Sequence, residues 1–297
     1  MKIYKNIQFS AIDLKGYKNE DSEIITIEAS CVTGFELAAT HEVKRKLAIE
    51  NVHEIMGRVV FDIPLSKLNQ VMKLRTIDNI WVIIGAKSDF DFSLSEEESI
   101  KNISDFTLNH LLWNKGLKAW NSVFEFYENL EDFQAEKRPK LEDKIPKFRC
   151  TCYRTGENVH KFSSMDVAKN VGGQIQEKFQ WSVKMKDFDI EVVVNIDSNQ
   201  AYFGIGLTHQ SLYKRNIEHF GPTTLRATIC ASMLELADIQ PGEIVVDPMC
   251  GGGSIPIEGA VAFKNGFFLA GDYHDLASQR TGNNLKVNRT RFFLKIT

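Results

Sequence analysis

Residues 243 to 260 read Glu-Ile-Val-Val-Asp-Pro-Met-Cys-Gly-Gly-Gly-Ser-Ile-Pro-Ile-Glu-Gly-Ala. The apolar run 244–246 predicts a short buried strand, and Asp247 follows at its carboxyl end. The three glycines 251–253 then predict a turn in which the backbone takes positive φ or lets a ligand approach closely. A helix that begins after such a loop directs unpaired N–H groups at the same space, and open α/β sheets bind ligands at the carboxyl ends of their strands. This stretch therefore predicts a cofactor-binding loop.

The spacing of the glycines separates two kinds of cofactor. A dinucleotide fingerprint requires a further glycine three residues after Gly253, but position 256 is Pro. A nicotinamide oxidoreductase is therefore disfavoured, whereas proline suits the first turn of a helix, where its missing N–H would be unpaired anyway. A second strand is predicted over 266–271, and Asp272 after it can accept hydrogen bonds from ribose hydroxyls. The alternative is an ordinary βαβ turn without a ligand; the order strand, Asp, glycines, helix, strand, Asp favours the cofactor.

Two strings in this region resemble the THUMP-domain-containing RNA methyltransferases. One is His-Phe-Gly-Pro-Thr-Thr-Leu-Arg-Ala-Thr from His219, and the other is Val-Asp-Pro-Met-Cys-Gly-Gly-Gly-Ser-Ile-Pro-Ile-Glu-Gly from Val246. The likeness extends back over 148–207 and more loosely to 33–36. The resemblance implies S-adenosyl-L-methionine as cofactor, N2-methylation of guanosine in tRNA, and a heterodimer with a small zinc-binding activator protein.

The resemblance also implies a role for the segment before the next helix. In related methyltransferases the start of the helix that follows Pro222 lies beside the methionine end of the cofactor, which indicates Thr223 and Thr224. The alternative, that these threonines only cap a packing helix, has equal support. The residues predicted to bind the cofactor are Asp247, Pro248, Gly251, Gly253, Asp272, Thr223 and Thr224. Cys250 is expected to fill space rather than act as a nucleophile, because no basic residue is adjacent.

The predicted fold class is α/β. It combines an N-terminal ferredoxin-like unit, a THUMP domain and the first part of a Rossmann-type class I methyltransferase domain. The expected boundaries are a mobile tail over 1–22, the ferredoxin-like unit over 23–88, the THUMP domain with a variable linker over 89–208, and the incomplete methyltransferase domain over 209–297. The pattern βαββαβ over 24–84 predicts the first of these domains.

Residues 147–207 predict the next domain. An alternating strand over 147–153, a helix capped by Ser163 or Ser164, and a hairpin over 190–207 resemble the core of a THUMP domain. Residues 96–106 have helical spacing, whereas 120–127 fit either a helix or a strand.

Composition bounds the class of protein. The chain has 297 residues, of which 43% are hydrophobic and 25% charged, as in a soluble globular protein with two or three domains. No apolar run approaches 18 residues and no signal-peptide core is present, so we expect no membrane span. The five cysteines form no Cys-x-x-Cys pair, which argues against a zinc site or a disulfide framework and for a reducing compartment. We expect no bound metal and a cytoplasmic location, with the nucleus as a second location.

A basic stretch lies within a chain whose net charge is −3. Residues 137–161 hold eight basic side chains against three acidic ones, a balance that suits phosphates. The alternative is a solvated linker face, and the family resemblance favours RNA over it. The residues predicted to bind RNA are Arg149, Arg154, Lys161, Lys214 and Arg215.

Only two strands of the seven expected in a Rossmann-type methyltransferase sheet are readable. The resemblance places a catalytic Asp-Pro-Pro-Phe-like tetrapeptide after the fourth strand, and no such string follows Asp272. We therefore predict no catalytic residue in this chain, and we expect its last third to be poorly stable alone, as in a truncated or alternatively spliced product. Two hypotheses follow: a tRNA guanine-N2 methyltransferase, or an RNA-binding module without catalysis.

Overall fold

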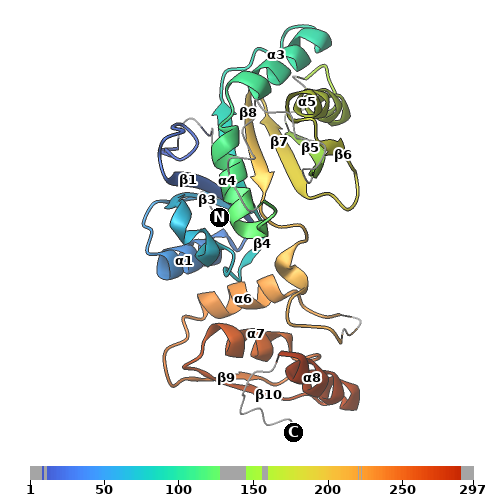
Figure 1. Cartoon of the computed structure of the whole chain (residues 1–297). Coiled ribbons are helices and arrows are strands. Elements are labelled where there is room, and N and C mark those ends of the chain that lie inside the picture. The colour runs from blue at the N-terminus through green and yellow to red at the C-terminus, as the bar shows by residue number, and fades with distance from the viewer. Residues whose placement is uncertain are drawn as a thin grey trace. The chain divides into compact units, whose positions relative to one another are not determined.

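The computed structural model describes residues 9, 12–127, 145–155, 160–219, 221 and 223–288 (Figure 1). The chain divides into two compact units. The first contains Met1–Glu28, Val60–Asn69 and Ile80–His209, and the second contains Ala29–Val59, Gln70–Asn79 and Gln210–Thr297. Both units are discontinuous in sequence, so each brings together segments that are far apart along the chain.

The predicted ferredoxin-like order of elements is confirmed. The elements are β1 (Ile24–Cys31), α1 (Glu36–Leu47), β2 (Val52–Ile55), β3 (Arg58–Pro64), the 3-10 turn η2 (Leu65–Lys67), α2 (Leu68–Val71) and β4 (Ile77–Lys87). Gly57 has φ 71° and turns β2 into β3, a conformation that glycine adopts without steric cost. Within one eight-stranded sheet the strand order is β2-β3-β1-β4-β8-β7-β5-β6.

The expected mobile tail over 1–22 is wrong for the residues that the structure describes. Phe9, Ile12 and Leu14 are buried, the Phe9 ring stacks on Tyr202 at 4.5 Å between centroids, and the Phe9 N–H donates to Gln200 Oε1 at 2.9 Å. The apolar side chains are too few and too irregularly spaced to give a periodic pattern. Phe9 has these two partners about 190 residues away, which is why the sequence suggested a tail.

Two helices follow β4, namely α3 (Glu96–Asn109) and α4 (Trp113–Phe124). A capping box between Ser95 and Glu98 begins α3. The ambiguous stretch 120–127 is helical as far as Phe124, where Glu125 ends α4 in the left-handed conformation. Gly116 lets α4 lie directly on the sheet, since a Cβ there would be 3.0 Å from Ile205 Cδ1.

The remaining elements of the first unit form the predicted strand, helix and hairpin. They are β5 (Lys147–Thr155), α5 (Ser164–Phe179), β6 (Ser182–Val183), β7 (Ile190–Asp197) and β8 (Gln200–Gly206). Strand β5 pairs in parallel with β7, which turns back antiparallel into β8. Ser163 caps α5 with a capping box, and the apolar residues spaced every four positions along the helix are buried, as predicted.

The C-terminal part of the second unit contains a two-stranded parallel sheet. Its elements are η5 (Leu212–Lys214), α6 (Ala227–Leu236), β9 (Ile244–Asp247), α7 (Ser254–Ala262), β10 (Phe267–Ala270) and α8 (Asp275–Asn288). Helix α7 covers one face of the sheet, where Gly259 lies against the Phe268 ring, and α6 packs on α7 (Figure 1). On the other face Ile244, Val246 and Phe267 are 63%, 59% and 50% exposed. Among the described residues, no helix combines the length and apolarity needed to cross a membrane.

Candidate cofactor-binding site

The two predicted acidic residues follow neighbouring parallel strands. Strand β9 ends at Asp247, which is paired in register with Ala270, the last residue of β10. Asp272 lies two positions after Ala270. The Asp272 carboxylate accepts hydrogen bonds from the N–H of Gly251 at 2.8 Å and of His274 at 2.9 Å. These two backbone donors, His274 first, lower the pKa of Asp272, so it is an anion at neutral pH. The structure thus brings together Asp247, Gly251 and Asp272.

The glycine loop requires glycine at two positions. Gly251 has φ 56° and Gly253 has φ 83°, and Gly253 is the N-cap of α7. A Cβ at Gly253 would also lie 2.8 Å from Thr281 Cγ2, closer than a side chain tolerates. No side chain caps the N-terminus of α7, so its first-turn N–H groups are available to an anionic or polar ligand. Pro256 lies in this first turn, as predicted.

Helix α8 holds the loop from one side through two residues that sequence reasoning missed. Asn284 is completely buried, and its Nδ2 donates to the carbonyls of Gly252 at 2.9 Å and His219 at 3.2 Å. Its Oδ1 accepts from the N–H groups of Glu218 at 3.1 Å and His219 at 2.8 Å. Thr281, one turn earlier, donates to the Gly251 carbonyl at 3.1 Å. The only sequence pattern that could have indicated them is two polar residues one helical turn apart.

The segment before α6 is placed differently from the prediction. Helix α6 begins at Ala227 with Arg226 as N-cap, so neither Thr223 nor Thr224 caps it. Thr224 Oγ1 instead accepts from the Gly221 N–H at 2.7 Å and closes a turn. Residues 218–219 of this segment are joined to the glycine loop through Asn284. A role for Thr223, Thr224 and the exposed Pro248 in cofactor binding stays a prediction.

Cys250 is buried beside the loop, with its Sγ 3.6 Å from Thr281 Oγ1. Burial raises the pKa of this thiol, because the charged thiolate would lose its hydration. A nucleophilic role requires the thiolate, so the geometry agrees with a space-filling role for Cys250.

Arg149 and Arg154, two of the residues predicted to bind RNA, lie on opposite faces of one strand. On β5, Arg149 is paired with Glu191 at 2.8 Å and lies 4.0 Å from the Phe188 ring centroid. Arg154 is five positions later in a regular strand and therefore points to the opposite face. Lys161 is exposed and donates to the Ser93 carbonyl at 2.7 Å. Residues 137–144 of the basic stretch lie outside the described residues.

Lys214 and Arg215 are adjacent but differ in their surroundings. Lys214 is exposed. The Arg215 guanidinium donates to the backbone carbonyls of Leu74, at 2.9 Å, and of Arg75. Burial lowers the pKa of Arg215, and its two terminal nitrogens donate inside the protein. The structure therefore argues against Arg215 as a phosphate ligand and leaves Lys214 available.

Two domain models match parts of the chain. Residues 122–205 match the THUMP domain model, and residues 215–287 match the model of the RMKL-like methyltransferase domain. The chain is 32% identical to the tRNA (guanine(6)-N(2))-methyltransferase THUMP3 of Homo sapiens over 98% of its own length and 70% of that protein. The same protein from Mus musculus is 32% identical over 94% of this chain and 68% of its own length.

Solved structures share the fold. TrmN from Thermus thermophilus aligns with a TM-score of 0.69 and 21% identity, covering 91% of this chain and 73% of TrmN. The predicted α/β fold class, with a THUMP domain followed by part of a methyltransferase domain, is confirmed. The length of the alignment with the human relative, together with both domain matches, shows that this chain belongs to the THUMP-domain-containing family of tRNA guanine-N2 methyltransferases.

Proposed function

We propose that this chain binds S-adenosyl-L-methionine between the ends of β9 and β10 and takes part in methylating guanine N2 in tRNA. The observation that supports the cofactor is the glycine loop, whose Gly251 N–H donates to Asp272, while the N–H of Met249 just before the loop donates to Asp247. The two Asp272 oxygens accept backbone N–H groups, including those of Gly251 and His274, and their remaining lone pairs can accept ribose hydroxyls. The positive φ of Gly251 and Gly253 keeps side chains out of the space that the ligand needs.

The chemistry in this proposal depends mainly on placing the reactants. The cofactor supplies an activated methyl group, and the exocyclic amine of the guanine accepts it and loses a proton. The residues of this chain contribute by fixing the cofactor in the loop, since correct positioning of the two reactants lowers the barrier. The target base would have to leave its stack to reach the methyl group. The tRNA substrate is suggested by the name of the THUMP3 relatives and by the match to the THUMP domain.

A second candidate function is RNA binding without methyl transfer. It is favoured by the match of residues 122–205 to the THUMP domain model, which does not depend on the cofactor site. The two candidates differ in methyl transfer, and only the first requires the chain to bind the cofactor. A heterodimer with a zinc-binding activator protein is part of the first candidate only.

Calorimetric titration with S-adenosyl-L-methionine tests the cofactor site. We expect saturable binding by the unaltered chain and binding about 10- to 100-fold weaker for Asp247→Ala, as is typical when a hydrogen bond to a charged group is lost. Asp105→Ala, an exposed change on α3 in the other unit, is the control and should bind normally. A folded chain that does not bind the cofactor but binds tRNA would contradict this proposal and support the second candidate.

Lys214 and Arg215 offer a matched test of RNA binding. We expect Lys214→Gln to weaken tRNA binding and to reduce the slope of log K against log salt by about 1, because one phosphate contact is lost. Arg215→Gln should instead lower the free energy of unfolding by about 1–3 kcal/mol, since it leaves two backbone carbonyls without their donor. Binding is measured by salt-dependent fluorescence anisotropy and stability by thermal melting. If Arg215→Gln weakened tRNA binding and Lys214→Gln lowered stability instead, the phosphate contact would lie on Arg215.

A further inference from the structure

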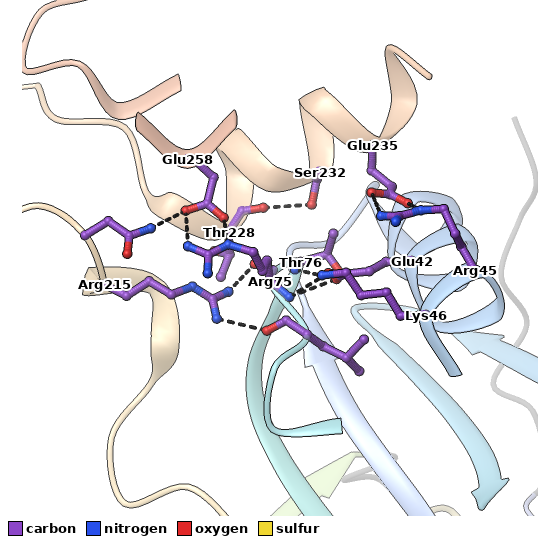
Figure 2. A network of polar contacts seen from close by, with 12 residues as sticks. Glu42, Arg45, Lys46, Arg75, Thr76, Arg215, Thr228, Ser232, Glu235 and Glu258 are labelled. Carbon is purple, nitrogen blue, oxygen red and sulfur yellow. Dashed lines mark hydrogen bonds and ion pairs between the residues drawn. The ribbon is translucent and has the colours of Figure 1, made fainter. Parts of the chain in front are cut away.

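Helix α7 carries the glycine loop at its N-terminus and a buried carboxylate one turn later. Glu258 is 1% exposed. Its Oε2 accepts from Arg75 Nη2 at 2.8 Å and from Asn216 Nδ2 at 2.6 Å, and its Oε1 accepts from Arg75 Nε. Figure 2 shows the Arg75 side chain extending to Glu258 from the segment before β4. The helix that follows the cofactor loop is therefore held by an arginine about 180 residues away in the sequence.

The backbone from which Arg75 extends is itself held in place. The N–H of Arg75 donates to both carboxylate oxygens of Glu42 at 2.9 Å, and Thr76 donates to Glu42 through its N–H at 2.8 Å and its hydroxyl at 2.7 Å. Glu42 is buried in α1 and is also paired with Lys46 (Figure 2). These bonds from the cation and the peptide donors lower the pKa of Glu42 despite its burial. The Arg75 carbonyl is bound by Arg215 on the other side.

The geometry of the Arg75–Glu258 pair is directional. Two parallel N–H···O bonds from one guanidinium fix both the distance and the angle of the carboxylate, which a single point charge does not. Burying two charges is costly, so such a pair contributes little net stability compared with apolar residues of similar volume. What it specifies is where Glu258, and with it the first turns of α7, must lie.

A second arginine–glutamate pair in the same unit has the same chemistry, but its glutamate lies on α6 instead of α7. Arg45 of α1 donates to Glu235 of α6 through Nε at 2.9 Å and Nη2 at 2.7 Å. The Arg45 side chain is 49% exposed, whereas that of Arg75 is 16% exposed. Because α6 does not carry the glycine loop, this pair provides a matched control for the first.

We propose that Arg75 is a positioning residue of the cofactor site, which acts through Glu258 to hold α7 and the glycine loop in the binding geometry. The cofactor named here rests on the proposed function. The segment between α2 and β4, from which Arg75 extends, thus controls the affinity for S-adenosyl-L-methionine.

Cofactor binding by three variants tests the proposal. We expect Arg75→Met to weaken binding at least about tenfold and Arg45→Met to leave it within about twofold, measured by calorimetry. The double variant Arg75→Met/Glu258→Gln removes the uncompensated buried carboxylate and should recover much of the melting temperature. Its affinity should stay low, because the two-point hold on α7 is still missing. If the double variant regained its affinity together with its melting temperature, the proposal would be overturned. Equal losses of affinity in Arg75→Met and Arg45→Met would also overturn it.

Amide hydrogen exchange without cofactor separates this proposal from the proposed function. In Arg75→Met we expect peptides covering 250–258 to exchange at least about tenfold faster, while Arg45→Met leaves them unchanged. If no chain binds the cofactor but this difference appears, the proposed function fails and the positioning role of Arg75 stands. Unchanged exchange of 250–258 in Arg75→Met would refute the positioning role even if the unaltered chain binds the cofactor.

Discussion

Gly259→Ala is expected to lower the free energy of unfolding of the second unit by about 3 kcal/mol, at the upper end of the cost of overpacking a core. An added Cβ would lie 2.6 Å and 2.8 Å from Cδ1 and Cζ of Phe268, whose ring is buried in β10. Neither group can yield easily, because α7 is covered by α6 and Phe268 fills the space between helix and sheet. We expect a fall in melting temperature of about 10 °C by calorimetry, with loss of cofactor binding at 37 °C.

Gly282→Ala is the matched control for this change. Gly282 also lies in a helix of the second unit, but no atom of the described residues lies within 4 Å of the position that its Cβ would occupy. Alanine there should raise stability by about 0.5–1 kcal/mol, because glycine is the poorer helix former. Equal melting temperatures for Gly259→Ala and the unaltered chain would show that α7 does not approach β10 this closely.

Asn284→Ala is expected to lower the affinity for S-adenosyl-L-methionine by about 100-fold, which corresponds to about 3 kcal/mol. The buried amide makes at least four hydrogen bonds to the backbone of residues 218, 219 and 252, each of them partly buried. Alanine leaves these peptide groups without partners, and each buried polar group that loses its partner costs about 1–3 kcal/mol. The glycine loop and the segment before α6 would then no longer be joined.

Asn283→Ala provides the comparison, since Asn283 is the neighbouring residue of the same type but is exposed. Its affinity and melting temperature should equal those of the unaltered chain within error. Calorimetric titration of both variants with the cofactor gives the result directly. If Asn284→Ala bound the cofactor as tightly as Asn283→Ala, the hydrogen bonds of Asn284 would have no part in the cofactor site.

Local pattern was enough to predict most elements and the centre of the candidate site. The alternation in β5 and the four-residue spacing in α5 are determined by one buried face, which the sequence displays directly. The glycine loop was predictable for a similar reason, since Gly251 and Gly253 are required by their own backbone angles. The paired acids Asp247 and Asp272 followed from the rule that ligands bind at the carboxyl ends of parallel strands.

The features that sequence reasoning missed depend on contacts between distant segments. Asn284 and Glu258 look like ordinary helix residues until the partners from residues 218–219 and 75 are placed beside them. Arg215 was predicted to contact RNA from its charge alone, and only the carbonyls of Leu74 and Arg75 show that it is used internally. The start of α6 was placed too early because threonine is a common helix-capping residue, whereas Thr224 closes a turn instead.

The discontinuous second unit has a consequence for synthesis on the ribosome. Its early segments end at residue 79, and its last segment begins at residue 210, 131 positions later. At about 5–20 residues per second, the nascent chain waits roughly 7–26 s before the partners of these segments emerge. During that interval Arg45 and Arg75 have no Glu235 or Glu258 to bind. The N-terminal segments of this unit therefore complete their ion pairs only after the C-terminal helices have been translated.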